Sequence, residues 1–344
     1  MDTVNENLAK RLLQPAWLAI SRRCVAVAPA VLALVLLVPA GCGGGSSAGG
    51  FQPAPITVIV PSLTEQYTFT VQSDIVYGQA EVSGGGSFTD LTLDLYIPDE
   101  FTNAERKQFP LMLMMHGGFF QQGTKTNPEI IPSAEAYARR GWIVASINYR
   151  LQADDPVPSS QVQPLIDSVT PPGPTLLERT VIAGIDDVIN ALEFLQARDD
   201  VYAPWTTLWG FSAGAYLALL TGYALDDFGI EPVEVAAVID FAGSIDGRFT
   251  GGTPFDFPLG RDPVLQIIHG TADAIVPFVE AETLEALATT AGLPFDFQAV
   301  AGAGHVIDLF ATNSSTGASL FQRTVDYQFE TVFAGQTSGP LVIE

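Results

Sequence analysis

Short, mostly apolar segments recur along this chain and constrain its fold more than any other feature. Strands that are buried on both faces of a parallel sheet are apolar in this way, because helices cover both faces. Between these segments, residues 176–197 carry apolar side chains at three- and four-residue steps, which is typical of an amphipathic helix. The alternation predicts an α/β fold with a mostly parallel, twisted sheet and helices on both faces. The segments are Leu111–Met115, Trp142–Ile147, Thr206–Trp209, Val235–Ile239, Val264–Ile268 and Phe295–Val300.

Three earlier segments have a different pattern. Ile56–Val60, Tyr67–Val71 and Leu91–Ile97 alternate in polarity or are rich in β-branched residues, and Gly84–Ser87 has the composition of a turn. We therefore expect N-terminal antiparallel strands before the parallel part of the sheet.

Two long segments fit neither strands nor helices. Residues 152–175 are rich in proline, and residues 243–262 are rich in glycine and phenylalanine. Both follow predicted strands, so both should leave the carboxyl edge of the sheet, where ligands bind in this fold class. They are candidate walls or a lid for a site, and the alternative is that they are ordinary surface loops.

The N-terminus has the pattern of an export signal. Residues 24–41 carry no charge and follow Arg22-Arg23, as in a signal peptide. The sequence Ala40-Gly41-Cys42 resembles a bacterial lipobox with Cys42 as the lipidated residue, although Pro39 departs from that pattern. Ordinary cleaved export and an uncleaved membrane anchor are the alternatives. All three place the protein outside the cytoplasm, most simply as a cell-envelope lipoprotein.

These observations predict four parts of the chain. A signal peptide spans 1–41, and a Gly/Ser-rich flexible tether spans 42–62. A single α/β domain spans 63–335, and a short C-terminal tail spans 336–344.

The charge of the chain excludes some partners. The formal net charge is -23, which repels phosphate backbones and argues against nucleic-acid binding. We expect membrane contact only through the lipid anchor, and the sequence does not indicate an oligomeric state. Both cysteines, Cys24 and Cys42, lie in or at the end of the leader, so we expect neither a disulfide nor a cysteine metal site in the folded part.

A nucleophile motif lies at the end of one predicted strand. Gly210-Phe211-Ser212-Ala213-Gly214 matches G-x-S-x-G, with a predicted strand before it and the helix-forming run 215–220 after it. A tight strand-to-helix turn requires small residues on both sides of the serine. We therefore expect Ser212 to project from the sheet edge as a nucleophile.

The partners of Ser212 follow from chain order. The chain has three histidines, and His305 is the last of them, in a Gly-rich loop after a predicted strand. Nucleophile, acid and base in that order favour His305 as the general base and Asp273 as the acid. Asp246 is the rival acid, in the loop after the preceding strand. His116 and His269 are expected to be structural.

From about Leu91 to Phe333 the sequence resembles carboxylesterases of the α/β-hydrolase superfamily. The resemblance is strongest to the branch with HGG-type oxyanion loops, which includes feruloyl and acetyl-xylan esterases. It implies that the backbone amides of Gly118, Phe119 and Ala213 bind an oxyanion, and that Tyr149 and Arg150 are structural. The residues that carry it are His116-Gly117-Gly118, Asn148-Tyr149-Arg150-Leu151, the elbow, His269-Gly270-Thr271-Ala272-Asp273 with Val276-Pro277, and Gly302-Ala303-Gly304-His305.

The predicted reaction is hydrolysis of a small-molecule or polymer-attached ester through an acyl-enzyme on Ser212. The sequence implies no cofactor and no metal ion. One alternative is a serine peptidase on the same fold. The other is a non-catalytic cell-surface binding protein that retained the fold.

Overall fold

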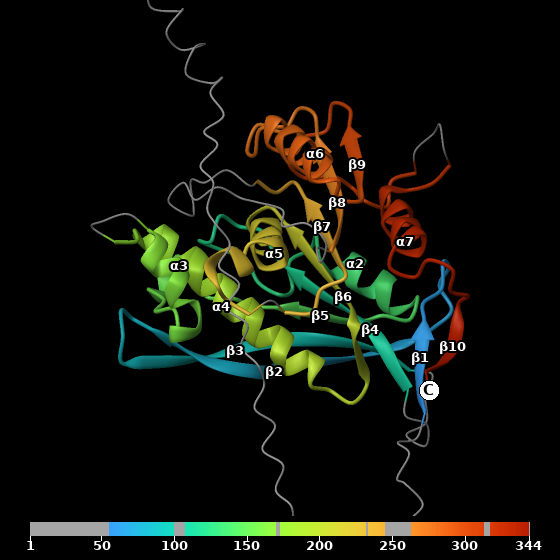
Figure 1. The fold of residues 1–344 in the computed structure, drawn as a ribbon, viewed down its shortest axis with the longest axis horizontal. Helices are drawn as coiled ribbons and strands as arrows, with labels where there is room; N and C mark the ends of the chain where they lie inside the picture. The colour runs from blue at the N-terminus through green and yellow to red at the C-terminus, as the bar shows by residue number, and fades with distance from the viewer. Residues whose placement is uncertain are drawn as a thin grey trace, which may run out of the picture. The chain divides into compact units, whose positions relative to one another are not determined.

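The apolar segments form the central strands of one mixed sheet in the computed structural model (Figure 1). The structure describes residues 55–99, 107–169, 173–231, 233–244, 263–312 and 317–343. All of them belong to the unit Pro53–Glu344. The predicted signal peptide, Cys42 and the rival acid Asp246 lie outside the described residues.

The described sheet begins with antiparallel strands and continues as a parallel sheet. β2 pairs antiparallel with β3 and β3 with β5, whereas every pairing from β5 through β4 to β9 is parallel. The strands turn progressively across the sheet, which is the expected twist (Figure 1). In sheet order they are β2 (Phe69–Val82), β3 (Ser87–Pro98), β5 (Ile143–Ile147), β4 (Lys107–Met115), β6 (Val201–Phe211), β7 (Ala237–Phe241), β8 (Val264–Gly270) and β9 (Phe295–Val300).

Helices cover both faces of the sheet, as the apolar strands predict. In β4, Leu111, Leu113 and Met115 belong to one buried cluster, and Met112 and Met114 belong to another. The first cluster includes side chains of α4, α5 and α6, and the second includes side chains of α2 and α7. The described helices are α2 (Ile131–Ala138), α3 (Gln163–Ser168), α4 (Leu176–Gln196), α5 (Ala213–Tyr223), α6 (Val279–Ala291) and α7 (Leu320–Glu330).

The predicted limits of the domain, 63 and 335, are wrong. Strand β1 (Ile56–Val60) lies within the predicted tether, and strand β10 (Gly339–Ile343) lies within the predicted tail. The two pair antiparallel, and β1 also pairs with β4. Val58 and Ile59 of β1 are fully buried in the core, and β10 is held to the sheet by its pairing with β1.

The 152–175 segment contains structure that its proline content did not predict. Short 3₁₀ turns at 152–154 and 160–162 lead into α3. The buried guanidinium of Arg150 holds the segment, because it donates to the Val157 carbonyl and to the carboxylates of Asp186 and Asp187 on α4. Arg150 therefore has the structural role that the sequence indicated. In the 243–262 segment, residues 245–262 lie outside the described part.

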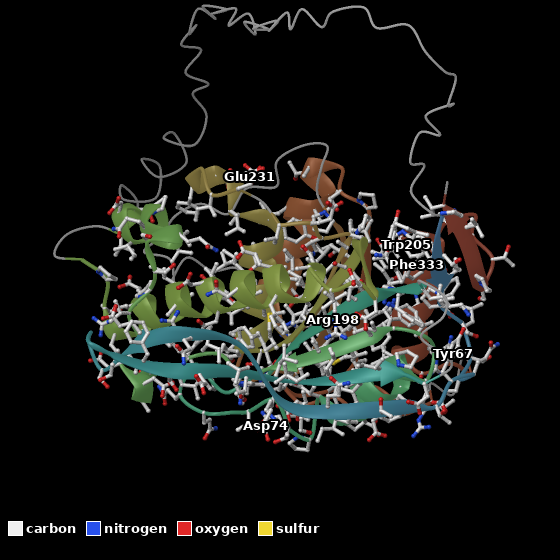
Figure 2. All side chains as sticks on the ribbon, turned by 90° about the horizontal axis from the view of Figure 1, so that it is seen from below. Tyr67, Asp74, Arg198, Trp205, Glu231 and Phe333 are labelled. Carbon is white, nitrogen blue, oxygen red and sulfur yellow. The ribbon has the colours of Figure 1, made fainter. Side chains whose placement is uncertain are left out.

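An aromatic corner lies at the end of the sheet beside β1 and β10. Trp205 and Phe333 lie in the same region of the molecule (Figure 2). Their rings meet edge to face with centroids 5.0 Å apart, and the Trp142 ring lies 5.7 Å from that of Phe333. This packing fixes the chain between α7 and β10 against the sheet.

Among the described helices, none combines the length and the apolar character needed to span a membrane.

A buried carboxyl in β7 predicts a pH dependence of stability. Asp240 Oδ1 accepts a hydrogen bond from the Gly243 N–H, and Oδ2 has no partner among the described residues. Burial raises the pKa of Asp240 to about 7, although the Gly243 N–H opposes this. Its pKa in the unfolded chain is about 4. The folded state therefore holds the proton more tightly, and the free energy of unfolding should fall as the pH rises from about 4 to about 7.

We expect Asp240→Asn to flatten that pH dependence. Between pH 5 and pH 8, the wild type should lose about 3 kcal/mol of stability through this group, and the variant should not. Thermal unfolding of both proteins at the two pH values measures the difference. The exposed Asp226→Asn serves as the control and should behave like the wild type. Equal pH dependence in Asp240→Asn and the wild type would contradict the prediction.

Candidate active site

Ser212 lies at a sharp turn between β6 and α5. Its backbone has φ 55° and ψ -115°, a strained conformation for a residue with a side chain. The turn is possible because its flanking glycines lack side chains. A Cβ on Gly210 would lie 2.3 Å from the Gly214 carbonyl oxygen, and one on Gly214 would lie 2.2 Å from that of Met115. The motif thus has a steric cause, and it holds Ser212 at the carboxyl end of the central strand.

His305 connects Ser212 to Asp273. The Ser212 Oγ lies 2.9 Å from His305 Nε2, and His305 Nδ1 lies 2.7 Å from Asp273 Oδ2. An ionised carboxylate can only accept, so Nδ1–H donates to Asp273, and Nε2 is left to accept from the serine hydroxyl. The structure therefore brings the three predicted residues into one hydrogen-bonded chain.

The loops after β8 and β9 bring His305 and Asp273 together. Gly270 ends β8, and a Cβ there would lie 2.4 Å from the carbonyl oxygens of Ala303 and Gly304. The absent side chain lets the His305 loop rest directly on the Asp273 loop. Their backbones also bond, since the Ala272 N–H donates to the Ala303 carbonyl.

Both oxygens of the Asp273 carboxylate accept hydrogen bonds. Its side chain is buried, and Oδ1 accepts from the backbone N–H groups of Ile275 and Val276. His269 lies beside it, with Nε2 3.3 Å from Asp273 Oδ2 and 2.9 Å from the Val276 carbonyl. His269 thus braces the acid loop, which agrees with the structural role expected of it.

His116 also has a structural environment. Burial lowers its pKa, so the ring is neutral, and Nδ1 donates to the Gly117 carbonyl over 2.7 Å. The ring stacks on Tyr149 with centroids 4.2 Å apart, and the Tyr149 hydroxyl donates to the His116 carbonyl. Together these contacts hold the start of the loop that carries Gly118.

Of the three residues expected to bind an oxyanion, two line the pocket that contains Ser212. Phe119 and Ala213 line a pocket together with Ser212, whereas Gly118 is not among its described lining residues. Ala213 is the first residue of α5, so its N–H has no acceptor within the helix. Gly118 and Phe119 both have positive φ, 124° and 56°, and this turns the loop sharply beside the serine.

Gly118→Ala tests the need for this turn. The new Cβ would lie 2.0 Å from the Gln122 carbonyl oxygen at a φ that disfavours alanine, so the loop must move. If this loop supplies an oxyanion donor, as the sequence predicts, we expect kcat for an ester to fall about 10²- to 10³-fold. Gly229→Ala is the control, because Gly229 also has positive φ but has open space around it. Undiminished turnover in Gly118→Ala would argue against a catalytic role for this loop.

The pocket beside Ser212 contains two residues that the sequence analysis did not single out, Tyr216 from the next turn of α5 and Ile275 from the loop after Asp273. Both lie close in the chain to motif residues, and that proximity was the available signal. Ser244 belongs to the 243–262 segment, which the sequence predicted as a candidate wall, and Val276 belongs to the motifs quoted for the resemblance. Phe120 completes the described lining, and the cavity volume is about 90 Å³. Among the described residues, no cluster of three or more His, Cys, Asp or Glu could bind a metal ion.

The sheet order, the strand–serine–helix turn and the loops after β8 and β9 define an α/β-hydrolase fold, as the sequence predicted. A family model described as BD-FAE matches residues 93–166. The match includes Gly118, Phe119 and Arg150 and ends before Ser212. A search of curated proteins gave no match.

Solved structures with this fold include an esterase from Thermogutta terrifontis. Its form phosphorylated by paraoxon is 20% identical to this chain, with 78% of this chain and 96% of that chain covered and a TM-score of 0.57. The butyrate-bound form is 18% identical, with coverages of 77% and 93% and a TM-score of 0.54. At this identity the likeness establishes the fold.

Proposed function

We propose that this protein is a serine carboxylic-ester hydrolase. The observation that carries the proposal is the hydrogen-bonded chain from Ser212 through His305 to Asp273, at the mouth of an apolar pocket. The esterases of the same fold and the BD-FAE match support it.

In the proposed reaction, Ser212 attacks the ester carbonyl while His305 Nε2 takes its proton. Asp273 stabilises the resulting imidazolium, and the amides of Gly118, Phe119 and Ala213 bind the oxyanion. The imidazolium then gives the proton to the departing alcohol. Water attacks the acyl-enzyme by the same route in reverse and releases the acid.

We also propose a preference for short acyl groups. The cavity of about 90 Å³ is lined mainly by apolar side chains, including Phe120, Tyr216 and Val276. A short acyl group fits within this volume, whereas a long acyl chain would extend beyond the described lining. The butyrate bound to the Thermogutta esterase is a short acid of this kind.

A series of p-nitrophenyl esters tests the function and the acyl preference together. We expect measurable hydrolysis, with kcat/KM highest for short acyl chains. Feruloyl and acetylated-sugar esters tested alongside would decide the narrower proposal, membership of the HGG-type branch with feruloyl and acetyl-xylan esterases. Cleavage of peptides in place of esters would favour the peptidase alternative, and turnover of neither would favour a binding protein.

For the leader, we propose export and lipidation at Cys42. The pattern that favours this is the uncharged run after Arg22-Arg23, followed by Ala40-Gly41-Cys42 and a Gly/Ser-rich segment. Two or three acyl chains anchor a protein stably, whereas a single chain binds only marginally.

Expression in a bacterial host should therefore give a protein that partitions into detergent and begins at a modified Cys42 by mass spectrometry. Cys42→Ser should release the protein or leave the leader uncut. A mature wild-type protein that is unlipidated and begins beyond Cys42 would show instead that it is simply secreted.

A further inference from the structure

A second, larger cavity begins at the residue after His305. Its described lining includes residues 306–310, Phe241 at the end of β7, Glu129 just before α2, and Ser133 in the first turn of α2. Its volume is about 300 Å³, and it shares no described lining residue with the pocket beside Ser212.

Aromatic contacts connect the wall of this cavity to the His305 ring. The Phe241 ring lies 4.9 Å from that of Phe211, which in turn lies 5.2 Å from the His305 ring. The Phe241 carbonyl also accepts the N–H of Ser212 over 2.9 Å. The cavity therefore lies beside the packed side chains that support Ser212 and His305, although its described lining includes neither of these two residues.

We propose that the second cavity binds the alcohol half of the ester and selects alcohols without negative charge. This rests on the proposed esterase function. In acylation the Ser212 Oγ–carbonyl bond forms, the carbonyl–alkoxy bond breaks, and the proton passes through His305 Nε2 to the leaving oxygen. The leaving oxygen must therefore approach His305, and residues 306–310 are continuous with it in the chain.

The walls of the cavity expose apolar surface that an alcohol group would cover. Val306 is 74% exposed and Phe310 is 41% exposed, although both are large apolar residues. The orientation of the Phe310 ring is fixed, because it stacks on the Phe321 ring with centroids 4.8 Å apart. A fixed aromatic face beside an open cavity is suited to contact with a ligand.

The charges of the lining set the direction of selectivity. Glu129 accepts from the Asn127 side-chain amide, and Asp308 accepts from the Phe310 N–H, but neither is paired with a described cation. None of the described lining residues is Lys, Arg or His. Two uncompensated carboxylates would repel an anionic alcohol group, and the net charge of -23 adds to this.

Esters with one acyl group and different alcohols test the proposal. We would use acetate esters of phenols that carry hydroxymethyl, trimethylammonio or carboxylate groups at the meta position. The kcat/KM of each ester is divided by its rate constant for alkaline hydrolysis, which corrects for differences in intrinsic reactivity. We expect kcat/KM for the carboxylate ester to be about tenfold or more below that for the hydroxymethyl ester. In the double variant Glu129→Gln/Asp308→Asn this ratio should fall to within about threefold.

The control is Glu193→Gln/Asp199→Asn, which makes the same change of net charge on and just after α4, in the other helical layer. It should keep the wild-type ratio. The deacylation rate should not change in any of these variants, because the alcohol has already left.

The alcohol subsite would be overturned if the ratio is unchanged in the Glu129/Asp308 variant, or if it changes equally in the control. Hydrolysis of esters by the wild type would leave the esterase proposal intact in either case. Absence of hydrolysis of every ester, together with no labelling of Ser212 by a fluorophosphonate, would overturn both proposals.

Discussion

Ser212→Ala should remain folded and lose about 10⁶-fold in kcat on a short-chain p-nitrophenyl ester. Alanine keeps a Cβ at the same strained φ of 55°, so the turn between β6 and α5 should persist. What disappears is the oxygen that His305 Nε2 contacts at 2.9 Å. Steady-state kinetics with purified protein measure the loss, and circular dichroism verifies the fold.

A fluorophosphonate probe provides an independent measurement. It should label the wild type at Ser212 and leave Ser212→Ala unmodified. Ser244→Ala is the matched control, since Ser244 lines the same pocket and yet should not be the nucleophile. If Ser212→Ala keeps its activity, or if the probe labels another residue, the assignment of the nucleophile is wrong.

Asp273→Asn should reduce turnover by about 10⁴-fold. The carboxylate accepts from His305 Nδ1 over 2.7 Å, and this fixes the tautomer in which Nε2 can accept from Ser212. An asparagine amide can donate to Nδ1, which favours the opposite tautomer with a proton on Nε2. The hydrogen bonds from Ile275 and Val276 to Oδ1 can persist, so we expect the loop to keep its conformation.

Asp246→Asn provides the comparison, because Asp246 is the rival acid in the sequence and lies outside the described residues. It should reduce kcat far less than Asp273→Asn. The reverse order of effects would move the acid to Asp246 and would leave the contact between Asp273 and His305 with a structural role.

The central fold could be predicted because each central strand is apolar over its own short length. The segments at 111–115, 142–147 and 264–268 all lie in or overlap strands of the parallel part of the sheet. The helix predicted for 176–197 is also confirmed as α4, where Thr175 and Glu178 form a capping box. In these segments the local pattern and the tertiary environment agree.

Other elements carried weaker local signals. Helix α6 buries only Ala281, Leu284 and Ala288 among its described residues, so its apolar stripe is thin. Strand β2 extends to Val82, well beyond the predicted end at Val71, and many of its side chains are exposed. An antiparallel strand with a solvated face needs fewer apolar residues than a strand that helices cover on both faces.

The sequence by itself determined the class of sheet, the position of the strand-to-helix turn at Ser212 and the chain order of Ser212, Asp273 and His305. These depend on local periodicity and on glycines that a tight turn requires. Only the tertiary structure decided that β1 pairs with β10 and that Arg150 meets Asp186 and Asp187. It also decided that residues 129–133, Phe241 and residues 306–310 enclose one cavity. Such contacts join segments far apart in the chain, and they form because the whole core packs in one way, which no local pattern encodes.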